Sequence, residues 1–406
     1  MKQSNPRIRF KEFNNKWCNY KLDQLGTFKS GIGFSDSQQG GTEGIPFFKV
    51  SDMNNIGNET EMRNANNYVT QEQIMKNSWK VINETPAIIF AKVGAALMLN
   101  RKRLVTRPFL IDNNTMSYSF DESWDKDFGL TLFQTINLPK YAQIGALPSY
   151  NASDIAMIKV NVPDVQEQSA IGSLFRTLDD LLSSYKDNLA NYQSLKATML
   201  TKMFPKAGQT VPEIRLDGFE GEWEIKKFKS ISNKRGKSNS KGYDYPAYSV
   251  SNQSGLIPQS EQFEGSRLEN LEKTSYKIVE PNEFAYNPAR INVGSIAFND
   301  LDETVIVSSL YVIFSLDKSI NNDYALLFIK SPEFNKEVRR NTEGSVREYL
   351  FYENFANIRI PIPPTFEEQQ AIGSYFSNLD NLINSHQEKI TQLETLKKKL
   401  LQDMFI

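Results

Sequence analysis

The side chains best suited to chemistry in this chain are amides and guanidinium groups that could contact nucleic-acid bases. One run holds Asn287, Arg290 and Asn292, with Pro288 and Gly294 placed to fix the loop that would present them. Asn and Arg can pair bidentately with the edges of adenine and guanine. The other interpretation is a turn whose Asn side chains cap backbone groups, and the local sequence favours neither.

Basic residues gather in two further stretches. Residues 226–241 contain seven lysines and arginines and no acidic residue, and Arg101, Lys102 and Arg103, with Arg107 close by, form the counterpart earlier in the chain. Such stretches can follow phosphates, and they can equally be solvated loops. The formal net charge is −1, so any attraction to nucleic acid must come from local clusters of this kind.

Signatures of catalysis are missing from the sequence. Gly236, Lys237 and Ser238 resemble the end of a phosphate-binding loop, but Ile231 stands where that loop requires its first glycine. Histidine-dependent nucleophilic catalysis would rest on His386, the single histidine, which falls in a helical pattern. We therefore expect no covalent chemistry, no cofactor and no metal on this chain.

Cysteine content and hydropathy point to a cytoplasmic globular protein. Cys18 is the single cysteine, which rules out a disulfide framework, and we expect it to be half-buried beside Trp17. Hydrophobic residues make up 39% and charged residues 23% of the 406 positions. No apolar run approaches a membrane span, and no signal-peptide core follows the N-terminus. This length suits two domains with connections between them.

The chain repeats itself, which suggests how these candidate residues are positioned. Residues 167–175 (EQSAIGSLF) return as residues 368–376 (EQQAIGSYF), and the offset of 201 holds to the C-terminus. Each half also opens on a similar segment, residues 6–17 and 212–223. Between these segments, apolar and turn-forming positions persist while most polar residues differ. The repeat predicts one fold that carries two different surfaces.

The repeated segment has the pattern of a long amphipathic helix. Apolar residues recur every seven positions from Ile171 and from Ile372, with further rows three and four positions later. Asp164 and Thr365 are suited to cap the first turns. His386 lies in the stripe, where a packed imidazole is favoured over a ligand role. The predicted interface positions are Ile171, Phe175, Leu178, Leu182, Leu195, Ile372, Phe376, Leu379, Ile383 and Leu396.

The two helices are expected to pack against each other, and if they pack antiparallel, the globular part of each half lies at an opposite end of the rod. A seam between two helices needs two apolar rows and these helices carry three, so part of the stripe should face the globular domains or another subunit. Helices of roughly 37 residues would be about 55 Å long. Their length would then act as a ruler between two globular parts related by a pseudo-twofold axis.

The interior of each half has the pattern of a mixed α/β (α+β) domain. Runs rich in β-branched and aromatic residues predict strands, and two periodic segments predict helices in the second half. The predicted strands are residues 87–91, 295–298, 304–307 and 310–314, and the predicted helices are residues 324–330 and 334–341.

The chain resembles the DNA-specificity (S) subunit of Type I restriction-modification enzymes. The resemblance rests on the paired Glu-Gln-x-Ala-Ile-Gly helices, on Val50-Ser51-Asp52 and on the run from Asn287 to Ser295, and it spans nearly the whole chain. It implies two α/β (α+β) target-recognition domains, residues 1–160 and 207–361, each followed by a coiled-coil spacer, residues 161–206 and 362–406. The two spacers would form an antiparallel two-helix coiled coil. Each domain would read half of a split, asymmetric double-stranded DNA target.

The resemblance also implies a non-catalytic subunit with enzymatic partners. Modification subunits, expected as two copies, would supply S-adenosylmethionine and adenine-N6 methylation, and restriction subunits would supply ATP- and Mg-dependent translocation and cleavage. One alternative is a coiled-coil adaptor that binds proteins without reading DNA, and another is an enzyme with an unrecognised active site, which would show activity as the purified chain alone. The predicted DNA contacts are Lys49, Ser51, Lys92, Arg101 and Arg103 in the first half, and Lys234, Arg235, Lys237, Asn252, Asn287, Arg290 and Asn292 in the second.

Overall fold

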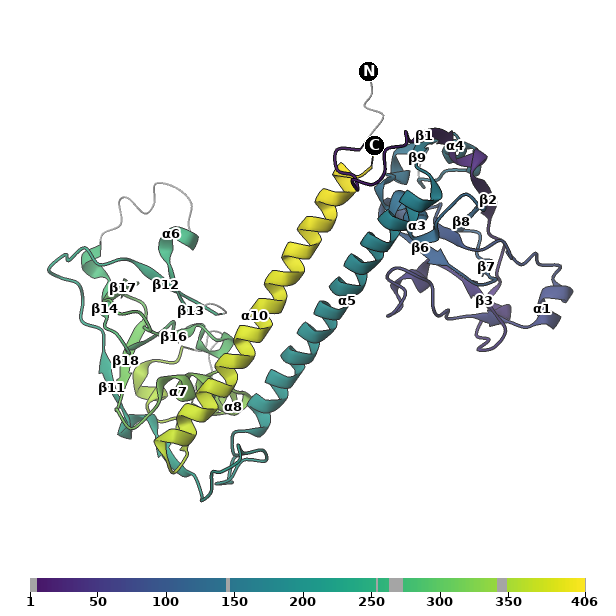
Figure 1. The fold of residues 1–406 in the computed structure, drawn as a ribbon. Helices are drawn as coiled ribbons and strands as arrows, with labels where there is room; N and C mark the ends of the chain where they lie inside the picture. Colours follow the sequence, from purple (N-terminus) through teal and green to yellow (C-terminus); the bar gives the residue numbers. More distant parts are fainter. Residues whose placement is uncertain (1–5, 144–146, 253–254, 263–272, 342–348, 406) are drawn as a thin grey trace. The chain divides into compact units, whose positions relative to one another are not determined.

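The chain folds into two compact units. The computed structural model describes residues 6–143, 147–252, 255–262, 273–341 and 349–405. Unit 1 comprises residues 1–186 and 388–406, and unit 2 comprises residues 187–387 (Figure 1). Each unit therefore combines one globular domain with parts of two long helices, and each is described below by itself.

The domain of unit 1 is built on a four-stranded antiparallel sheet in the order β2 (Gly26–Ser30), β8 (Thr115–Phe120), β5 (Ala87–Ala91), β6 (Lys102–Val105). A smaller sheet contains β4 (Tyr68–Val69), β3 (Ile45–Phe48) and β7 (Leu110–Ile111), and β1 (Cys18–Lys21) pairs with β9 (Lys159–Val162). The helices are α1 (Gln71–Lys76), α2 (Ala95–Met98), α3 (Lys126–Thr135) and α4 (Ala152–Ala156).

Both faces of the larger sheet in unit 1 are covered. Ile88 and Phe90 of β5 pack in one hydrophobic cluster with α3, whereas Ala87 and Ile89 pack in a second cluster on the opposite face. Successive residues of a strand point to opposite faces, so a strand buried on both sides needs an unbroken apolar run. The predicted strand at residues 87–91 is confirmed as β5.

The domain of unit 2 repeats this sheet in the order β11 (Ser232–Arg235), β18 (Val312–Leu316), β15 (Phe284–Tyr286), β16 (Ile296–Phe298). Two-stranded pairs form between β12 (Tyr248–Ser251) and β13 (Gly255–Pro258), β14 (Lys277–Val279) and β17 (Val305–Val307), and β10 (Glu224–Lys227) and β19 (Arg359–Ile362). The helices are α6 (Gln259–Gln262), α7 (Asn322–Ile329), α8 (Pro332–Asn341) and α9 (Tyr352–Phe355). The predicted strands and helices of this half are confirmed within a few residues.

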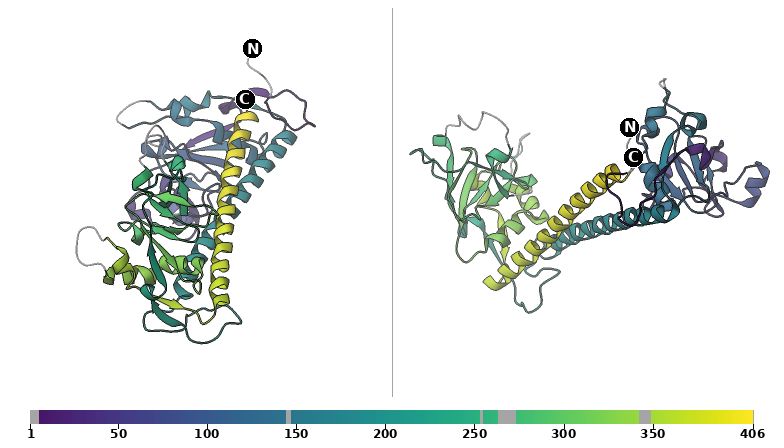
Figure 2. Two further views of the ribbon diagram at one scale, coloured as in Figure 1. Left: turned by 90° about the vertical axis from the view of Figure 1, so that its left-hand side faces the viewer. Right: turned by 45° about the horizontal axis from the view of Figure 1, so that its top comes forward.

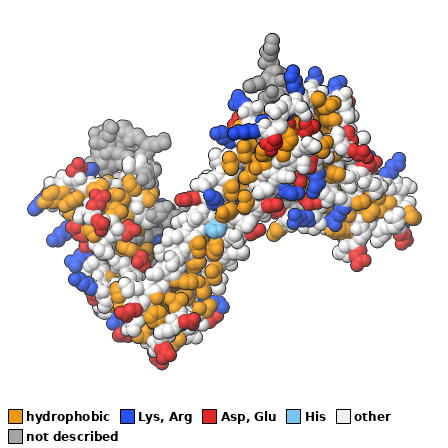
Figure 3. Space-filling view, in the orientation of Figure 1, with side chains coloured by type: hydrophobic (Ala, Val, Ile, Leu, Met, Phe, Trp, Pro, Cys, Tyr) orange, Lys and Arg blue, Asp and Glu red, His pale blue; other side chains and the backbone are white. Residues whose placement is uncertain are grey.

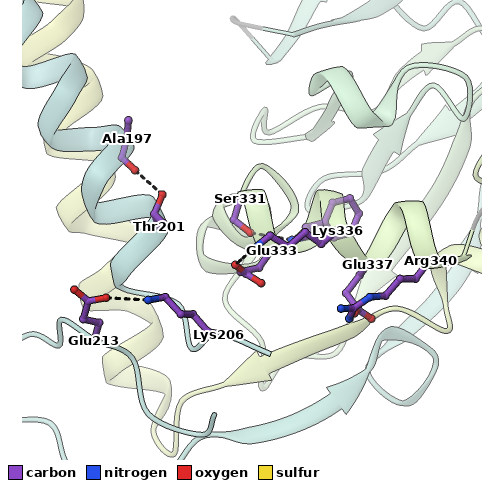
Figure 4. A network of polar contacts seen from close by, with 10 residues as sticks. Ala197, Thr201, Lys206, Glu213, Ser331, Glu333, Lys336, Glu337 and Arg340 are labelled. Carbon is purple, nitrogen blue, oxygen red and sulfur yellow. Dashed lines mark hydrogen bonds and ion pairs between the residues drawn. The ribbon is translucent and has the colours of Figure 1, made fainter. Parts of the chain in front are cut away.

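Local polar contacts define the start and the surface of α8. The Ser331 hydroxyl oxygen accepts a hydrogen bond from the backbone N of Phe334 at 3.2 Å, and Lys336 pairs with Glu333 at 2.6 Å one turn away. Figure 4 shows these contacts beside the end of α5, where Lys206 reaches Glu213 at 3.2 Å. A cap and pairs three residues apart stabilise a short surface helix.

The two long helices are α5 (Val165–Lys202) and α10 (Phe366–Asp403). The backbone N of Glu167 donates to Asp164 Oδ1 at 3.0 Å, and the backbone N of Glu368 donates to Thr365 Oγ1 at 3.2 Å. Each cap satisfies one of the free backbone donors of a first turn. Both predicted caps are confirmed.

Within each unit the two helices run antiparallel. In unit 1, Asp179 pairs with Lys397 and Lys186 pairs with Glu394, so residue numbers rise along α5 while they fall along α10. Unit 2 shows the same direction, since the Tyr192 ring contacts His386 and Lys196 pairs with Asp380. Figure 2 shows the helices side by side. His386 is a packed imidazole, with its ring 5.1 Å from that of Tyr192.

The start of each helix packs into the adjoining domain core, together with the end of the other helix. The buried members in unit 1 are Ile171, Phe175 and Leu178 with Met404, and in unit 2 they are Ile372, Phe376 and Leu379 with Met203. The expectation that part of the stripe faces the globular domains is therefore confirmed. Leu182 is buried and Ile383 half-buried, whereas Leu195 and Leu396 are 39% and 44% exposed.

The repeated opening segments fasten each helix to its domain. The Arg9 guanidinium forms two 2.6 Å contacts with the Glu167 carboxylate, and Trp17 Nε1 donates to the same carboxylate at 3.2 Å. The Arg215 guanidinium likewise donates two hydrogen bonds of 2.7 Å to the Glu368 carboxylate. Cys18 is exposed, so the expectation of a half-buried thiol is wrong. Trp17, the residue directly before β1, is buried in the core, and Cys18 points to the opposite side.

Candidate nucleic-acid interface

The β15–β16 loop (residues 287–295) is a candidate DNA-contact loop in unit 2, and its own hydrogen bonds fix its conformation. Asn287 Oδ1 accepts a hydrogen bond from the backbone N of Ala289 at 3.0 Å, and the Asn287 N donates to Ser295 O at 3.1 Å. Gly294 ends the loop with φ 88°, a conformation that glycine adopts at little cost. Asn287 thus has the turn-capping role, and Arg290 and Asn292 are the exposed polar side chains.

The end of β12 and the residue after it, Asn252, lie next to this loop. A Cβ atom on Gly294 would lie 3.8 Å from the backbone oxygen of Asn252, and Ser295 Oγ is 3.5 Å from Val250 O. The structure therefore brings Asn252, Arg290 and Asn292 into one neighbourhood, although they are up to 40 residues apart in the sequence.

The basic residues of β11 are less available than the sequence suggests. Lys234 Nζ lies 2.6 Å from the Glu353 carboxylate, and its hydrogen bond lowers the pKa of Glu353. Arg235 is 3.7 Å from Glu283. Lys237 is exposed beyond the end of the strand. Because β11 and β15 run in the same direction, Lys237 and the β15–β16 loop lie at the same end of the sheet.

The β5–β6 loop (residues 92–101) occupies the equivalent place in unit 1. Lys92 begins this loop and Arg101 ends it, and the Arg101 guanidinium donates a hydrogen bond to Asn54 Oδ1. Asn54 ends the short 3₁₀ segment Val50–Asn54, and the predicted Lys49 and Ser51 lie at the other end of this segment. Lys49 is half-buried, with Nζ 3.1 Å from Gln39 Oε1, and Ser51 is exposed.

Arg103 and Lys102 lie on opposite faces of β6. Arg103 Nη1 donates to the Lys102 carbonyl at 3.0 Å, its Nε is buried without a partner among the described residues, and burial lowers the pKa of Arg103. Lys102 is 4% exposed, with Nζ 2.6 Å from Ile136 O. The basic run at residues 101–103 is thus not one cationic surface, because strand geometry buries its central lysine.

Two further groups of side chains near the candidate loops were not predicted from the sequence. Asn55 Nδ2 donates at 3.0 Å to the amides of both Asn64 and Asn66, which forms an amide cluster next to the 3₁₀ segment. The exposed rings of Tyr349 and Phe351 stack 5.9 Å apart, and Leu350 between them bonds Pro288 O. An asparagine-rich stretch and an aromatic alternation were the available signals.

The long helices carry a second candidate surface, for protein partners. Leu181 and Leu195 on α5 and Leu382 and Leu396 on α10 are 39–44% exposed. These four leucines are related in pairs by the 201-residue repeat. Figure 3 shows apolar side chains at the surface of both helices. Exposed apolar side chains at repeated positions are typical of contact surfaces.

The described residues provide neither a cluster of metal ligands nor a membrane-spanning helix. Among the described residues no group of three or more His, Cys, Asp or Glu side chains could hold a metal ion. No described helix combines the length and the hydropathy needed to span a membrane.

Comparison with known proteins gives a consistent result. The chain is 22% identical over 274 residues to the Type I restriction enzyme MjaVIII specificity subunit of Methanocaldococcus jannaschii, and 21% identical over 279 residues to the putative MjaX specificity subunit of the same organism. These matches cover 63% and 66% of this chain, and 63% and 64% of the relatives. The chain thus spans just under two thirds of their length.

Solved structures share the fold. The S subunit of a Type I restriction-modification system from M. genitalium superposes with a TM-score of 0.61 at 13% identity, over 99% of both chains. A chain from a study of complex assembly and conformational transition in the type I R-M system gives 0.50 at 15%, over 95% of this chain and 96% of that one. The family model for the Type I restriction modification DNA specificity domain matches residues 14–191 and 220–395, and the chain belongs to this family.

Proposed function

We propose that the chain is the DNA-recognition subunit of a Type I restriction-modification complex, in which each unit reads one half of a split target. The observation that carries this proposal is the equivalence of two loops. The β5–β6 loop and the β15–β16 loop join the same two strands of equivalent sheets, yet they present different side chains. Two similar scaffolds with different tips suit an asymmetric target.

The side chains at these loops suit direct contact with DNA. Arg290 and Asn292 would contact base edges, and Lys237 would contact phosphate at the same end of the sheet. In unit 1, Lys92 and Arg101 bound the equivalent loop and Arg103 follows in β6, while Lys49 and Ser51 lie at the start of the 3₁₀ segment that Arg101 contacts. Lys234 and Arg235 are paired with carboxylates. Their contribution to DNA binding would therefore require these ion pairs to open.

Catalysis would come from other chains. Modification subunits, in two copies, would bind S-adenosylmethionine and methylate adenine at N6, and restriction subunits would bind ATP and Mg and cleave the DNA. This chain would act as a non-catalytic scaffold for them. The family to which the chain belongs is named for DNA specificity, which agrees with a division of labour between recognition and chemistry.

The exposed leucines of α5 and α10 would be the docking surface for the modification subunits. Leu195 and Leu396 stand at equivalent places in the repeat, so two copies of one partner could bind them in the same way. The three-row stripe supports this assignment, because only part of the stripe is buried within the described chain.

Selection of bound duplexes from a random oligonucleotide pool tests the proposal. The full chain, assembled with its modification subunits, should enrich two short motifs with a constant unspecified gap. Arg290→Ala should relax one position of one motif, a loss of about 1–3 kcal/mol at that base. Lys336→Ala is the matched control, because Lys336 is a basic surface residue paired with Glu333 on α8. It should leave both motifs unchanged.

The second candidate function is a protein adaptor that does not read DNA sequence. The observation in its favour is the net charge of −1, which provides no long-range attraction to phosphate. A pool that yields no enriched motif, despite a stable assembly with the modification subunits, would favour the adaptor and contradict DNA recognition.

A further inference from the structure

The tip of the β5–β6 loop presents two apolar side chains to solvent. Met98 ends α2 and Leu99 follows it, and each is 58% exposed. Leu97, directly before them, is 2% exposed and packs in the domain core. The short helix is thus anchored by one leucine while the next two side chains point away from the core. Exposed apolar side chains held by a buried neighbour indicate a contact surface.

The backbone of this tip is held from both sides. The Asn100 side chain donates from Nδ2 to Ile136 O at 3.2 Å and accepts from the backbone N of Leu138 at 3.1 Å. At the other end of α2, the backbone N of Gly94 donates to Pro148 O at 2.9 Å. Because both ends are fixed, Met98 and Leu99 are presented with little conformational freedom. A fixed presentation reduces the entropy lost on binding.

Positive charge flanks this apolar tip. Lys92 and Arg101 bound the loop on its two sides, and residues 92–107 contain no acidic residue. Apolar side chains with cations on both sides suit a partner that has apolar groups between negatively charged phosphates. This charge pattern favours DNA over a protein partner for the face that Met98 and Leu99 form.

The equivalent loop of unit 2 indicates which part of the DNA the tip would face. There the β15–β16 loop exposes Arg290 and Asn292, whose chemistry suits base edges. By equivalence, Met98 and Leu99 would also lie against base edges. In the major groove the apolar group on a base edge is the C5-methyl of thymine. We propose that unit 1 reads thymine methyl groups in its half-site through Met98 and Leu99.

This inference rests on the proposed function, and deoxyuridine substitution tests it. Deoxyuridine pairs as thymidine does but lacks the C5-methyl group. The half-site read by unit 1 is the motif that Arg290→Ala leaves unchanged. In binding titrations of the full complex on the selected duplex, replacing thymidines singly in that half-site should weaken binding by about fourfold at one or more positions. The same replacements in the other half-site serve as the internal comparison.

Variants of the chain assign the effect to the loop. Met98→Ala combined with Leu99→Ala should bind the thymidine duplex about as weakly as the deoxyuridine duplex, so that discrimination is lost. Leu99→Met keeps an apolar side chain and should keep discrimination. Met157→Ala is the matched control, because Met157 is 54% exposed in the same domain but lies outside the loop. Thermal unfolding of each variant checks that the domain stays folded.

The outcomes separate the two levels of the proposal. A pool without any enriched motif contradicts the proposed function itself. A selected target with equal affinity for thymidine and deoxyuridine, or one with no thymine in the unit 1 half-site on either strand, overturns only the methyl readout. Loss of modification-subunit binding in the double alanine variant, with discrimination intact, would also overturn it and assign this face to a protein contact.

Discussion

Lys102 provides a quantitative prediction about the stability of unit 1. Its ammonium group is buried in the core side of β6, with one hydrogen bond of 2.6 Å to Ile136 O, and burial lowers its pKa from 10.5 to about 7. Lys102 pairs with Phe90 across the sheet as Ile296 pairs with Tyr286 in unit 2. The same structural position therefore holds a buried lysine in one unit and a buried isoleucine in the other.

The lowered pKa determines how stability should change with pH. Below about pH 7 the lysine is protonated in both the folded and the unfolded chain, so the full cost of burying a charge is present. Between pH 7 and 10.5 the unfolded chain binds one proton more than the folded chain, so the free energy of unfolding rises by about 1.4 kcal/mol per pH unit. The whole window corresponds to about 5 kcal/mol.

Lys102→Met removes this cost while it keeps a side chain of similar length. The variant also loses the hydrogen bond to Ile136 O, a loss of about 1–3 kcal/mol. At pH 6 we therefore expect a net gain of at least about 2 kcal/mol in the free energy of unfolding of unit 1. The contribution of Lys102 to the pH dependence between pH 7 and 10 should disappear.

Urea unfolding at pH 6, 7, 8 and 9, followed by tryptophan fluorescence, measures this effect. Trp17, Trp79 and Trp124 belong to unit 1 and Trp223 to unit 2, so the signal reports mainly unit 1. Ile296→Met is the matched control in unit 2 and should leave the pH dependence unchanged. A Lys102→Met variant that is less stable than the parent at pH 6, or that keeps the parent's change of unfolding free energy with pH, would contradict a destabilising buried charge at Lys102.

Three further predictions concern the helices. Glu167→Gln should lower the stability of unit 1 by about 3–5 kcal/mol in urea unfolding because it leaves the Arg9 guanidinium without its carboxylate, and a loss below 1 kcal/mol would contradict the buried pair. Leu195→Lys and Leu396→Lys should change chain stability by less than about 0.5 kcal/mol yet weaken modification-subunit binding in titrations, and unchanged binding would place that surface elsewhere. Deleting one heptad from both helices should change the length of the gap between the two motifs selected from the oligonucleotide pool. An unchanged gap would contradict a role of helix length in setting the distance between the two domains.

The long helices were predictable because their signals are local. The caps and the seven-residue periodicity each lie within one continuous stretch of sequence, and the repeat shows the same stretch twice. The packing of the apolar stripe against the globular domains was also predictable, since a contact between two helices uses two apolar rows and each helix carries three. The particular contacts were not predictable, because the ion pair between Arg9 and Glu167 spans 158 positions and depends on the folded domain.

The sequence located the loops of the candidate interface, but it did not show which side chains in them are free to contact DNA. Strand patterns on both sides located the loops at residues 92–101 and 287–295. The role of each polar group depended on tertiary neighbours: Lys234 meets Glu353, Arg235 meets Glu283, and Asn287 closes its own turn. Burial of Lys102 was hidden for a different reason, since a run of three basic residues reads as exposed unless the strand face is known.

Mapping of N6-methyladenine in DNA exposed to the assembled complex tests whether each unit reads one half of a split target. We expect methylation within an asymmetric sequence of two specified parts and a constant gap, and we expect Arg290→Ala to change the bases of one part while the other stays the same. Methylation at one continuous motif, methylation independent of sequence, or a change of both parts by Arg290→Ala would contradict the assignment of one half-site to each unit.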